Sequence, residues 1–352
     1  MGTGRSPAEI LTMKAMVTGG AGFIGSTLVD RLLAEGHEVD VVDDLSTGSL
    51  ANLAAARADR TNALKIHRVD LRDPTVVEVI ERQRPAVIFH LAAQVDVRTS
   101  VADPVLDATV NVLGSLNVLE GARRAGAEKV VFASSGGTIY GDVDPADLPL
   151  KESHPQRPVS PYGVAKKSVV DYLHAYRELH ELEYTALALG NVYGPRQDPH
   201  GEAGVVAIFC QRILADRPLT VFGDGMQTRD YVHVRDVVDA TYRAATQELP
   251  PVGGLDTRAF NVGTGVPTSV LDVAETLRRA AGCRAPIEFA PKRAGEQMES
   301  YLVVQKAKSV LGWRPRIDLE AGLADTFAWF AARRSPPGTV PPPTLNASQR
   351  SS

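Results

Sequence analysis

Short apolar runs alternate with amphipathic stretches along the first half of the chain, from residue 14 to about residue 190. The apolar runs are rich in β-branched residues and nearly continuous, which is typical of parallel strands buried on both faces. The stretches between them carry apolar residues at the spacing of one helix face. This pattern predicts an α/β fold with strands at 14–18, 38–42, 65–69, 86–91, 129–133 and 184–189, and helices at 23–35, 74–82, 104–125 and 162–180.

After about residue 191 this rhythm breaks into short pieces punctuated by glycine and proline. The contrast predicts a Rossmann-type, doubly wound parallel sheet with a smaller C-terminal cap that binds the substrate. Because ligands of open α/β sheets bind at the carboxyl edge, we expect the cap there. The expected domains are 13–190 for the sheet, with 229–262 returning to it, and 191–228 plus 263–331 for the cap; 1–12 and 332–352 are expected to be disordered.

Composition narrows the choice of ligand. The 352 residues are 44% hydrophobic with a net charge of -4, so there is no basic footprint for nucleic acid. No apolar run approaches the roughly 20 residues that span a bilayer, so no membrane partner is expected. Two lone cysteines, Cys210 and Cys283, form no disulfide framework, which suits a reducing cytoplasm. The histidines show no metal-site spacing, and no metal is expected.

A glycine-rich turn lies where the first strand passes into the first helix, in Val17-Thr18-Gly19-Gly20-Ala21-Gly22-Phe23-Ile24-Gly25. Glycines there allow backbone N–H groups to approach a pyrophosphate, which the helix amino terminus also attracts. A bare turn explains some matches of this kind, but the second strand ends at Asp43, eighteen residues past Gly25. A carboxylate at that point accepts from ribose hydroxyls and repels a 2′-phosphate, which favours NAD over NADP. The alternative is that Asp43 only caps its loop.

Asp70 and Leu71 close the third strand, where an acidic side chain can meet the adenine amino group. Capping of the next helix is an equally good interpretation of Asp70.

Tyr162-Gly163-Val164-Ala165-Lys166 places a phenol and an ammonium one helical turn apart, on one face. A free tyrosine has a pKa near ~10, so a base that works near neutrality needs nearby positive charge. Lys166 and an oxidised nicotinamide ring can supply it. The alternative, a tyrosine and a lysine on a solvated helix, is disfavoured because the pair follows a complete dinucleotide motif.

With these motifs the chain resembles the extended short-chain dehydrogenase/reductase family, and within it the UDP-glucose 4-epimerases. The likeness runs from about residue 13 to residue 330 and includes an ordered set of motifs: 18–25, 43–48, 90–94, Ser134-Ser135 leading to Tyr140-Gly141, Tyr162 with Lys166, 191–196, 223–225, 227–234, 261–263 and 311–313.

The resemblance implies NAD as cofactor and a UDP-sugar as substrate. Tyr162 would take the proton from the sugar C4 hydroxyl, and Lys166 would bind the nicotinamide ribose. The 4-keto sugar would then rotate and be reduced on its other face. The implied cofactor residues are Gly19, Gly22, Phe23, Ile24, Gly25, Asp43, Asp44, Ser46, Thr47, Gly48, Asp70, Leu71, Leu91, Ala92, Ala93, Gln94, Tyr162 and Lys166. The implied substrate residues are Ser135, Gly136, Tyr162, Asn191, Gly204, Val205, Val206, Val221, Phe222, Gln227, Arg229, Arg293 and Glu296.

One catalytic hydroxyl of the family is missing. Relatives carry a serine or threonine four residues before the equivalent of Tyr140, where this chain has Gly136. Ser135, at the end of its strand, is the expected substitute, and Thr138 is the less favoured one.

Several other activities compete with epimerisation. Dehydratases carry an Asp-Glu pair where this chain has Gly137-Thr138, which disfavours dehydration and also decarboxylation. A nucleotide-sugar reductase or dehydrogenase that consumes free cofactor stays open, whereas a non-catalytic NAD sensor would not need Tyr162 and Lys166 together.

The identity of the sugar is less constrained. UDP-glucose and UDP-galactose follow from the resemblance. Ser300 lies where relatives carry a bulky residue, and its small size leaves room for an N-acetyl group. UDP-glucuronate is a further candidate because Arg196 could meet its carboxylate, although Asp198 in the same loop would oppose it. The resemblance also implies a homodimer in which helices 104–125 and 162–180 form a four-helix bundle with their copies, since both helices are apolar on more than one face.

Overall fold

The computed structural model describes residues 12–58, 63–200, 204–292 and 297–333. Seven parallel strands form the central sheet in the order β10-β6-β5-β4-β1-β2-β3. Their bounds are β1 Lys14–Thr18, β2 Glu38–Asp43, β3 Leu64–Arg68, β4 Val87–His90, β5 Lys129–Ser135, β6 Glu183–Leu189 and β10 Ala259–Val262. The predicted α/β fold with a Rossmann-type parallel sheet is confirmed.

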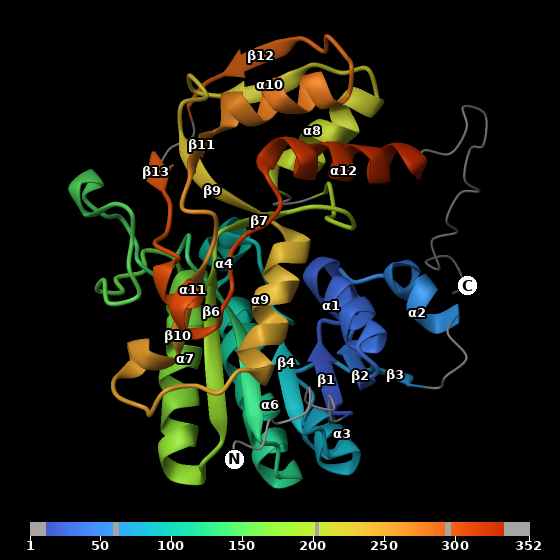
Figure 1. The fold of residues 1–352 in the computed structure, drawn as a ribbon, viewed down its shortest axis with the longest axis vertical. Coiled ribbons are helices and arrows are strands. Elements are labelled where there is room, and N and C mark those ends of the chain that lie inside the picture. The colour runs from blue at the N-terminus through green and yellow to red at the C-terminus, as the bar shows by residue number, and fades with distance from the viewer. Residues whose placement is uncertain (1–11, 59–62, 201–203, 293–296, 334–352) are drawn as a thin grey trace, which may run out of the picture.

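Helices cover both faces of this sheet, so the domain has three layers (Figure 1). On one face α1 (Phe23–Ala34) and α9 (Val234–Thr246) pack together, with η1 (Leu50–Leu53) and α2 (Ala54–Ala58) beside α1. On the other face lie α3 (Thr75–Gln83), α6 (Gly114–Ala125) and α7 (Pro161–His180). Leu28 and Val237 belong to the first core, and Ile80 and Leu173 to the second. Burial on both sides explains why these strands read as continuous apolar runs.

The predicted helix 104–125 is interrupted. It consists of α5 (Pro104–Ala108), a π-helical turn η2 (Thr109–Leu113) and α6. The short helix α4 (Val97–Ala102), which the sequence did not predict, precedes it. Because π turns are rare and concentrate at functional sites, we expect a functional role for residues near this turn.

The cap is built from shorter elements. Strand β9 (Thr228–His233) pairs with β7 (Asn191–Tyr193), β11 (Pro267–Ser269) and β13 (Glu299–Ser300), and β8 (Leu219–Phe222) pairs with β12 (Ile287–Ala290). Helices α8 (Val205–Leu214), α10 (Val270–Ala280) and α12 (Leu319–Ala332) pack around a separate core that contains Phe209 and Leu277. Figure 1 shows these helices and β12 above the central sheet.

Segment 229–262, which we expected to return to the sheet domain, divides between the two parts. Its strand β9 belongs to the cap sheet, whereas α9 packs on α1 and β10 forms the edge of the central sheet beside β6. The remaining elements are α11 (Gln305–Val310), which packs on β10, and the single turns η3 (Pro145–Asp147) and η4 (Leu255–Arg258). Over the described ranges, the structure contains no helix long and apolar enough to span a membrane.

Candidate active site

The glycine turn after β1 brings two loops into contact. Gly19 has a φ of +71°, and a Cβ there would lie 2.8 Å from the backbone nitrogen of Ala92 in the loop after β4. A Cβ on Gly25 would lie 2.1 Å from the carbonyl oxygen of Gly19. Only glycine fits either position, because the turn needs a left-handed residue and α1 must start directly against it. The turn is therefore built for close approach of backbone groups.

The start of α1 has the properties of an anion site. Gly22 is its N-cap and makes no side-chain cap bond, and no acidic residue lies in the first turn. The first N–H groups of a helix, here those of Phe23, Ile24 and Gly25, have no partner within the helix and point toward the N-terminal side. These features fit the pyrophosphate of a dinucleotide.

Asp43 lies at the end of β2, beside the glycine turn. Its carboxylate accepts hydrogen bonds from the backbone N–H groups of Ala21 and Leu45, both at 2.9 Å. Burial raises the pKa of Asp43, and these two hydrogen bonds act in the opposite direction. A Cβ on Gly48 would lie 2.8 Å from the same carboxylate, so loop 43–48 closes tightly over it.

The other residues of this loop form a local turn. Asp44 accepts hydrogen bonds from the backbone and the hydroxyl of Ser46, and Thr47 leads on to Gly48.

The carboxylate of Asp70 forms an ion pair with Arg72. Its carboxylate binds the Arg72 guanidinium through both oxygens and accepts from the Arg72 backbone N–H at 2.8 Å. The hydrogen bonds from Arg72 lower the pKa of Asp70. Asp70 does not cap α3, because Asp73 accepts from Thr75 at the start of that helix. A contact of Asp70 or of the buried Leu71 with adenine stays a prediction.

Hydrogen bonds to Thr18 of β1 fix the loop after β4, and His90, the last residue of β4, is held between Thr18 and Ser115. The Thr18 hydroxyl accepts from the backbone N–H groups of Leu91 and Ala92 and lies 2.7 Å from His90 Nδ1. His90 Nε2 lies 2.8 Å from the Ser115 hydroxyl, and full burial lowers the pKa of His90 to about 3. The imidazole is therefore neutral and structural.

Further along this loop, beyond Ala93, Gln94 and Asn111 hold each other. The backbone N–H of Gln94 donates to Asn111 Oδ1, and Asn111 Nδ2 donates to the carbonyl of Gln94, both at 2.9 Å.

Tyr162 and Lys166 lie at the start of α7, whose N-cap is Ser160. Lys166 Nζ donates to the Ala133 carbonyl at 2.8 Å and lies 5.7 Å from the centroid of the Tyr162 ring. Burial lowers the pKa of Lys166 to about 8. Burial and the charge of Asp107 raise the pKa of Tyr162 to about 12, whereas a hydrogen bond with Ser135 lowers it. A base at Tyr162 thus requires more positive charge than Lys166 alone brings.

The structure explains the missing hydroxyl at position 136. A Cβ on Gly136 would lie 2.7 Å from Leu302 Cδ1 and 3.1 Å from two backbone carbonyl oxygens, so a side chain here would have to displace Leu302 and crowd both carbonyls. Ser135, at the end of β5, is instead hydrogen-bonded with Tyr162. The hydroxyl of Thr138 is buried without a hydrogen-bond partner in the described part of the chain.

The residues expected to bind the substrate come from several cap elements. Asn191 is exposed at the start of β7, and Gly204 and Val205 start α8. Gln227 donates to the Phe222 carbonyl, and Arg229 lies in β9 beside Ser300 of β13. The side chains of Val206 and Val221 lie in the cap core, so only their backbone could face a ligand. Arg293 and Glu296 lie outside the described residues.

Two polar residues of this region were not predicted. Asp107 and Asn111 are both buried, and Asn111 donates to Asp107 at 2.8 Å. Their spacing of four within the mostly apolar segment 104–113 places them on one face, and this was the available signal.

Together, the dinucleotide turn and the Tyr–Lys pair, both at the carboxyl edge of one parallel sheet, define an enzyme of the extended short-chain dehydrogenase/reductase class. Within this class the chain belongs to the family described as GDP-mannose 4,6 dehydratase, whose model matches residues 16–326.

Similar proteins cover nearly the same length. UDP-glucose 4-epimerase of Mycolicibacterium smegmatis is 48% identical over 318 residues, which are 90% of this chain and 98% of that protein. The crystal structure of UDP-glucose 4-epimerase of Thermotoga maritima with UDP-glucose is 42% identical, with a TM-score of 0.83 over 91% of this chain and 99% of that one. The crystal structure of UDP-glucose 4-epimerase of Thermus thermophilus in complex with NAD is also 42% identical. Its TM-score is 0.82, and the match covers 91% of this chain and 100% of that one.

Proposed function

We propose that this protein is an NAD-dependent 4-epimerase that interconverts UDP-glucose and UDP-galactose. The observation that carries this proposal is the position of Tyr162, Lys166 and Ser135 at the edge of the sheet that also bears the dinucleotide turn. Relatives with UDP-glucose 4-epimerase activity match nearly the whole chain. Bound NAD accepts and returns a hydride, and the residues of the chain handle the proton and the orientation of the sugar.

Tyr162 is the proton carrier in this scheme. Its phenolate takes the proton from the sugar C4 hydroxyl as the C4 hydrogen leaves as hydride, and it gives the proton back when the 4-keto sugar is reduced. Without substrate the Ser135 hydroxyl interacts with Tyr162 and lowers the pKa of the phenol; with the sugar bound, its single proton would be donated to the C4 oxygen instead. Lys166 adds positive charge behind the ring and binds the nicotinamide ribose. The configuration at C4 is inverted because the 4-keto sugar rotates between the two hydride transfers while the UDP part stays bound.

The cap would hold the UDP part. Arg229 and Arg293 would bind the pyrophosphate, since guanidinium groups are permanently charged and match phosphate oxygens. Gln227, Phe222 and the start of α8 would surround the uridine.

Dehydration is disfavoured although the family description names a dehydratase. Elimination of water needs a separate acid and base beside the Tyr–Lys pair. The corresponding positions here are Gly137 and Thr138, and a Cβ on Gly137 would meet no atom within 4 Å. Neither residue carries a carboxyl group that could serve as the separate acid or base.

UDP-glucuronate is the weaker of the alternative substrates. Arg196, the side chain that could meet its carboxylate, donates to Asp30 of α1 at 2.5 Å and is mostly buried. This ion pair engages Nη2 and competes with a substrate carboxylate for Arg196, whereas Nη1 is buried without a hydrogen-bond partner among the described residues. Ser300 is small and buried, so UDP-N-acetylhexosamines remain the second substrate class to test.

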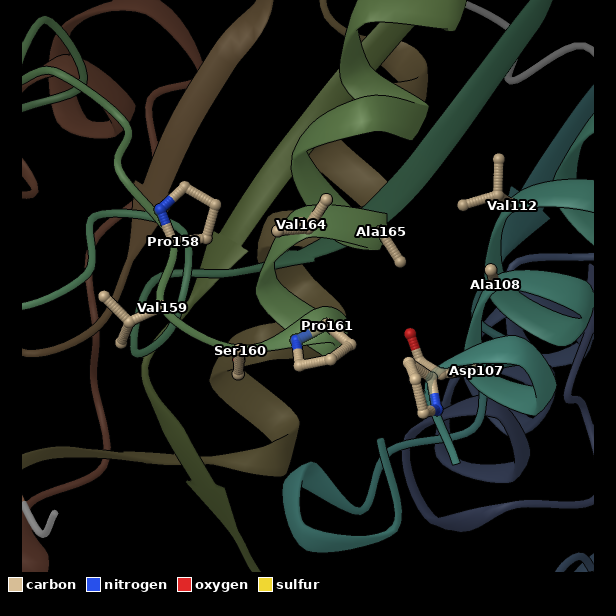
Figure 2. A pocket seen from close by; sticks show the side chains of 10 residues that line it. Asp107, Ala108, Val112, Pro158, Val159, Ser160, Pro161, Val164 and Ala165 are labelled. Carbon is tan, nitrogen blue, oxygen red and sulfur yellow. The ribbon is translucent and has the colours of Figure 1, made fainter. Parts of the chain in front are cut away.

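We also propose a homodimer formed by the helices 104–125 and 161–180. These helices expose large apolar side chains, among them Val105, Leu113, Tyr172 and Leu179. A cavity of about 500 Å³ opens between α5 and the start of α7, lined mainly by prolines, valines and alanines (Figure 2). A second copy would cover this apolar surface.

We further propose a cytoplasmic location, which the free cysteines support. Cys210 is buried, Cys283 is partly buried, and both are free thiols. A reducing cytoplasm suits such a chain.

A panel of UDP-sugars tests the activity. The purified protein is incubated with UDP-glucose, UDP-galactose, their N-acetylated forms and UDP-glucuronate, and the products are separated by chromatography. We expect interconversion of UDP-glucose and UDP-galactose without added reductant. Net formation of an oxidised or dehydrated sugar would contradict the proposal, and Tyr162→Phe is the control for contaminating activity.

A further inference from the structure

Asp107 is a buried carboxylate close to the catalytic pair, and its side chain is only 1% exposed. Its Oδ1 accepts hydrogen bonds from Gln94 Nε2 at 3.1 Å and from Asn111 Nδ2 at 2.8 Å. Its Oδ2 has no hydrogen-bond partner among the described residues. A buried carboxylate with a free oxygen is unfavourable for folding, so a purely structural role does not account for it.

Burial raises the pKa of Asp107, whereas the hydrogen bonds from Asn111 and Gln94 and the charge of Lys166 lower it. In its ionised form the carboxylate acts on both catalytic side chains. It raises the pKa of Lys166 against the effect of burial, and it also raises the pKa of Tyr162. Lys166 itself donates to a backbone carbonyl, so its hydrogen bond brings no compensating negative charge. Figure 2 shows Asp107 on α5 facing Ala165 of α7 across the cavity.

Few other charges surround this group. Helices α4 and α7 and the turn η2 pack against α5. His90 is neutral, and Lys167 pairs with Asp171, whereas Glu120 of α6 faces Tyr176 further along α7. Asp96 and Asp103 cap α4 and α5, and Arg98 lies on α4. Further along α7 lie His174, Arg177, Glu178 and His180, of which Arg177 pairs with Glu178 and Glu183, and Arg157 lies in the loop before α7.

We propose that Asp107 is a positioning residue of the epimerase reaction, whose carboxylate keeps the Lys166 ammonium charged while its hydrogen bonds fix the cofactor-lining loop through Gln94. The inference rests on the proposed function. In the reaction Lys166 must stay positive beside a second positive charge, that of the oxidised nicotinamide ring. Asp107 supplies the negative charge that makes this combination stable, and it does so without contact with the substrate.

The test removes the charge and keeps the shape. Asp107→Asn retains a carbonyl oxygen that can accept from Gln94 and Asn111. Asp107→Glu retains the charge, and Asp103→Asn is the matched control because it neutralises an exposed carboxylate that caps the same helix. The pH dependence of kcat is measured for each NAD-loaded enzyme. The ionisation of Tyr162 is followed separately by phenolate absorbance without substrate, with Tyr162→Phe as the blank.

We expect both limbs of the pH–rate profile of Asp107→Asn to move to lower pH by roughly half a unit to one unit. The acid limb moves because Tyr162 ionises more readily, and the alkaline limb moves because Lys166 loses its proton earlier. The phenolate titration should move by the same amount, and Asp103→Asn and Asp107→Glu should keep the wild-type limbs.

Unmoved limbs and an unmoved phenolate titration in a folded Asp107→Asn would overturn the proposal, whatever the loss of rate. If Asp107→Asn does not fold, Asp107→Ser removes the same charge and carries the test. Failure of both neutral variants to fold, with Asp107→Glu folded, would make the carboxylate a folding requirement and also contradict the proposal. A phenolate shift in an enzyme that epimerises no UDP-sugar would instead show that the proposed function is wrong and the electrostatic role of Asp107 is right.

Discussion

Lys166 Nζ lies 5.7 Å from the centroid of the Tyr162 ring and is held there by a hydrogen bond to the carbonyl of Ala133, two residues before the end of β5. This relationship ties the catalytic helix to the central sheet. Because the carboxyl ends of β1, β4 and β5 meet at one edge, the Tyr–Lys pair and the dinucleotide turn share one site.

Tyr162→Phe should retain the fold and bound NAD but lose nearly all turnover. The phenol serves as both base and acid, and phenylalanine keeps the ring without the proton. Turnover is measured with UDP-galactose, and bound NAD is quantified after denaturation. More than about a tenth of the wild-type rate would show that Tyr162 does not carry the proton, since loss of general acid–base catalysis costs about 10²–10⁴-fold.

Ser135→Ala should lower the turnover rate at least tenfold with little change in NAD binding. Loss of a hydrogen-bond donor to the C4 oxygen costs about 1–3 kcal/mol, and the pKa of Tyr162 should also rise because the hydrogen bond from Ser135 lowers it. The acid limb of the pH–rate profile should therefore move to higher pH. Thr138→Val should be milder, and equal losses in both variants would contradict the role given to Ser135.

Gly136→Ser should not restore a catalytic hydroxyl. Its Cβ would lie 2.7 Å from Leu302 Cδ1 and close to two backbone oxygens, so the substitution should lower Tm without raising kcat. Thermal unfolding followed by circular dichroism gives the first value and the epimerase assay the second. An unchanged Tm would mean that position 136 has more room than the structure shows.

Asp43→Ala combined with Asp44→Arg should allow NADP to bind. Removal of the Asp43 carboxylate ends its repulsion of a 2′-phosphate, and the added arginine supplies attraction. NAD should bind more weakly, because Asp43 also holds the Ala21 N–H of the glycine turn. Direct binding titrations with both dinucleotides measure the change, with Asp44→Arg alone as the control. An unchanged preference in the double variant would show that Asp43 does not face the ribose.

Light scattering at micromolar concentration should give the mass of a dimer. Leu113→Glu with Tyr172→Glu should shift the mass toward a monomer, since both residues are exposed on the helices of the proposed bundle. Phe289→Glu, a change at an exposed apolar residue of the cap, should leave the mass unchanged. A wild-type monomer, or a dimer that survives the double substitution, would count against this interface.

Much of the fold could be predicted because its signals are local. Continuous apolar runs marked the first six strands of the sheet, and the glycine turn with Asp43 marked the dinucleotide half of the site. The strand β10 was missed because its four residues are ordinary in composition and only long-range pairing with β6 makes them a strand. The π turn η2 was missed for a similar reason, since it packs against α7 of another part of the chain. The pair Asp70–Arg72 is local, and the interpretation of Asp70 as a helix cap or an adenine ligand overlooked the arginine two residues on.

Within the site, the roles of Ser135 and Asp107 could likewise not be predicted from local sequence alone. The sequence pointed to Ser135 only after Gly136 departed from the family pattern, and the steric reason for that glycine lies in Leu302, far along the chain. The role of Asp107 depends on its electrostatic interaction with Lys166, which lies on another helix.

The most direct measurement follows the hydrogen at C4. UDP-galactose carrying deuterium at C4 is incubated with the purified enzyme and unlabelled NAD in solution, and the UDP-glucose formed is isolated for mass spectrometry and NMR. Our account predicts UDP-glucose with the deuterium retained at C4 and none in the NAD of the solution, because the same hydride leaves and returns within one site. Loss of the label to water or to free cofactor, or no conversion at all, would contradict it.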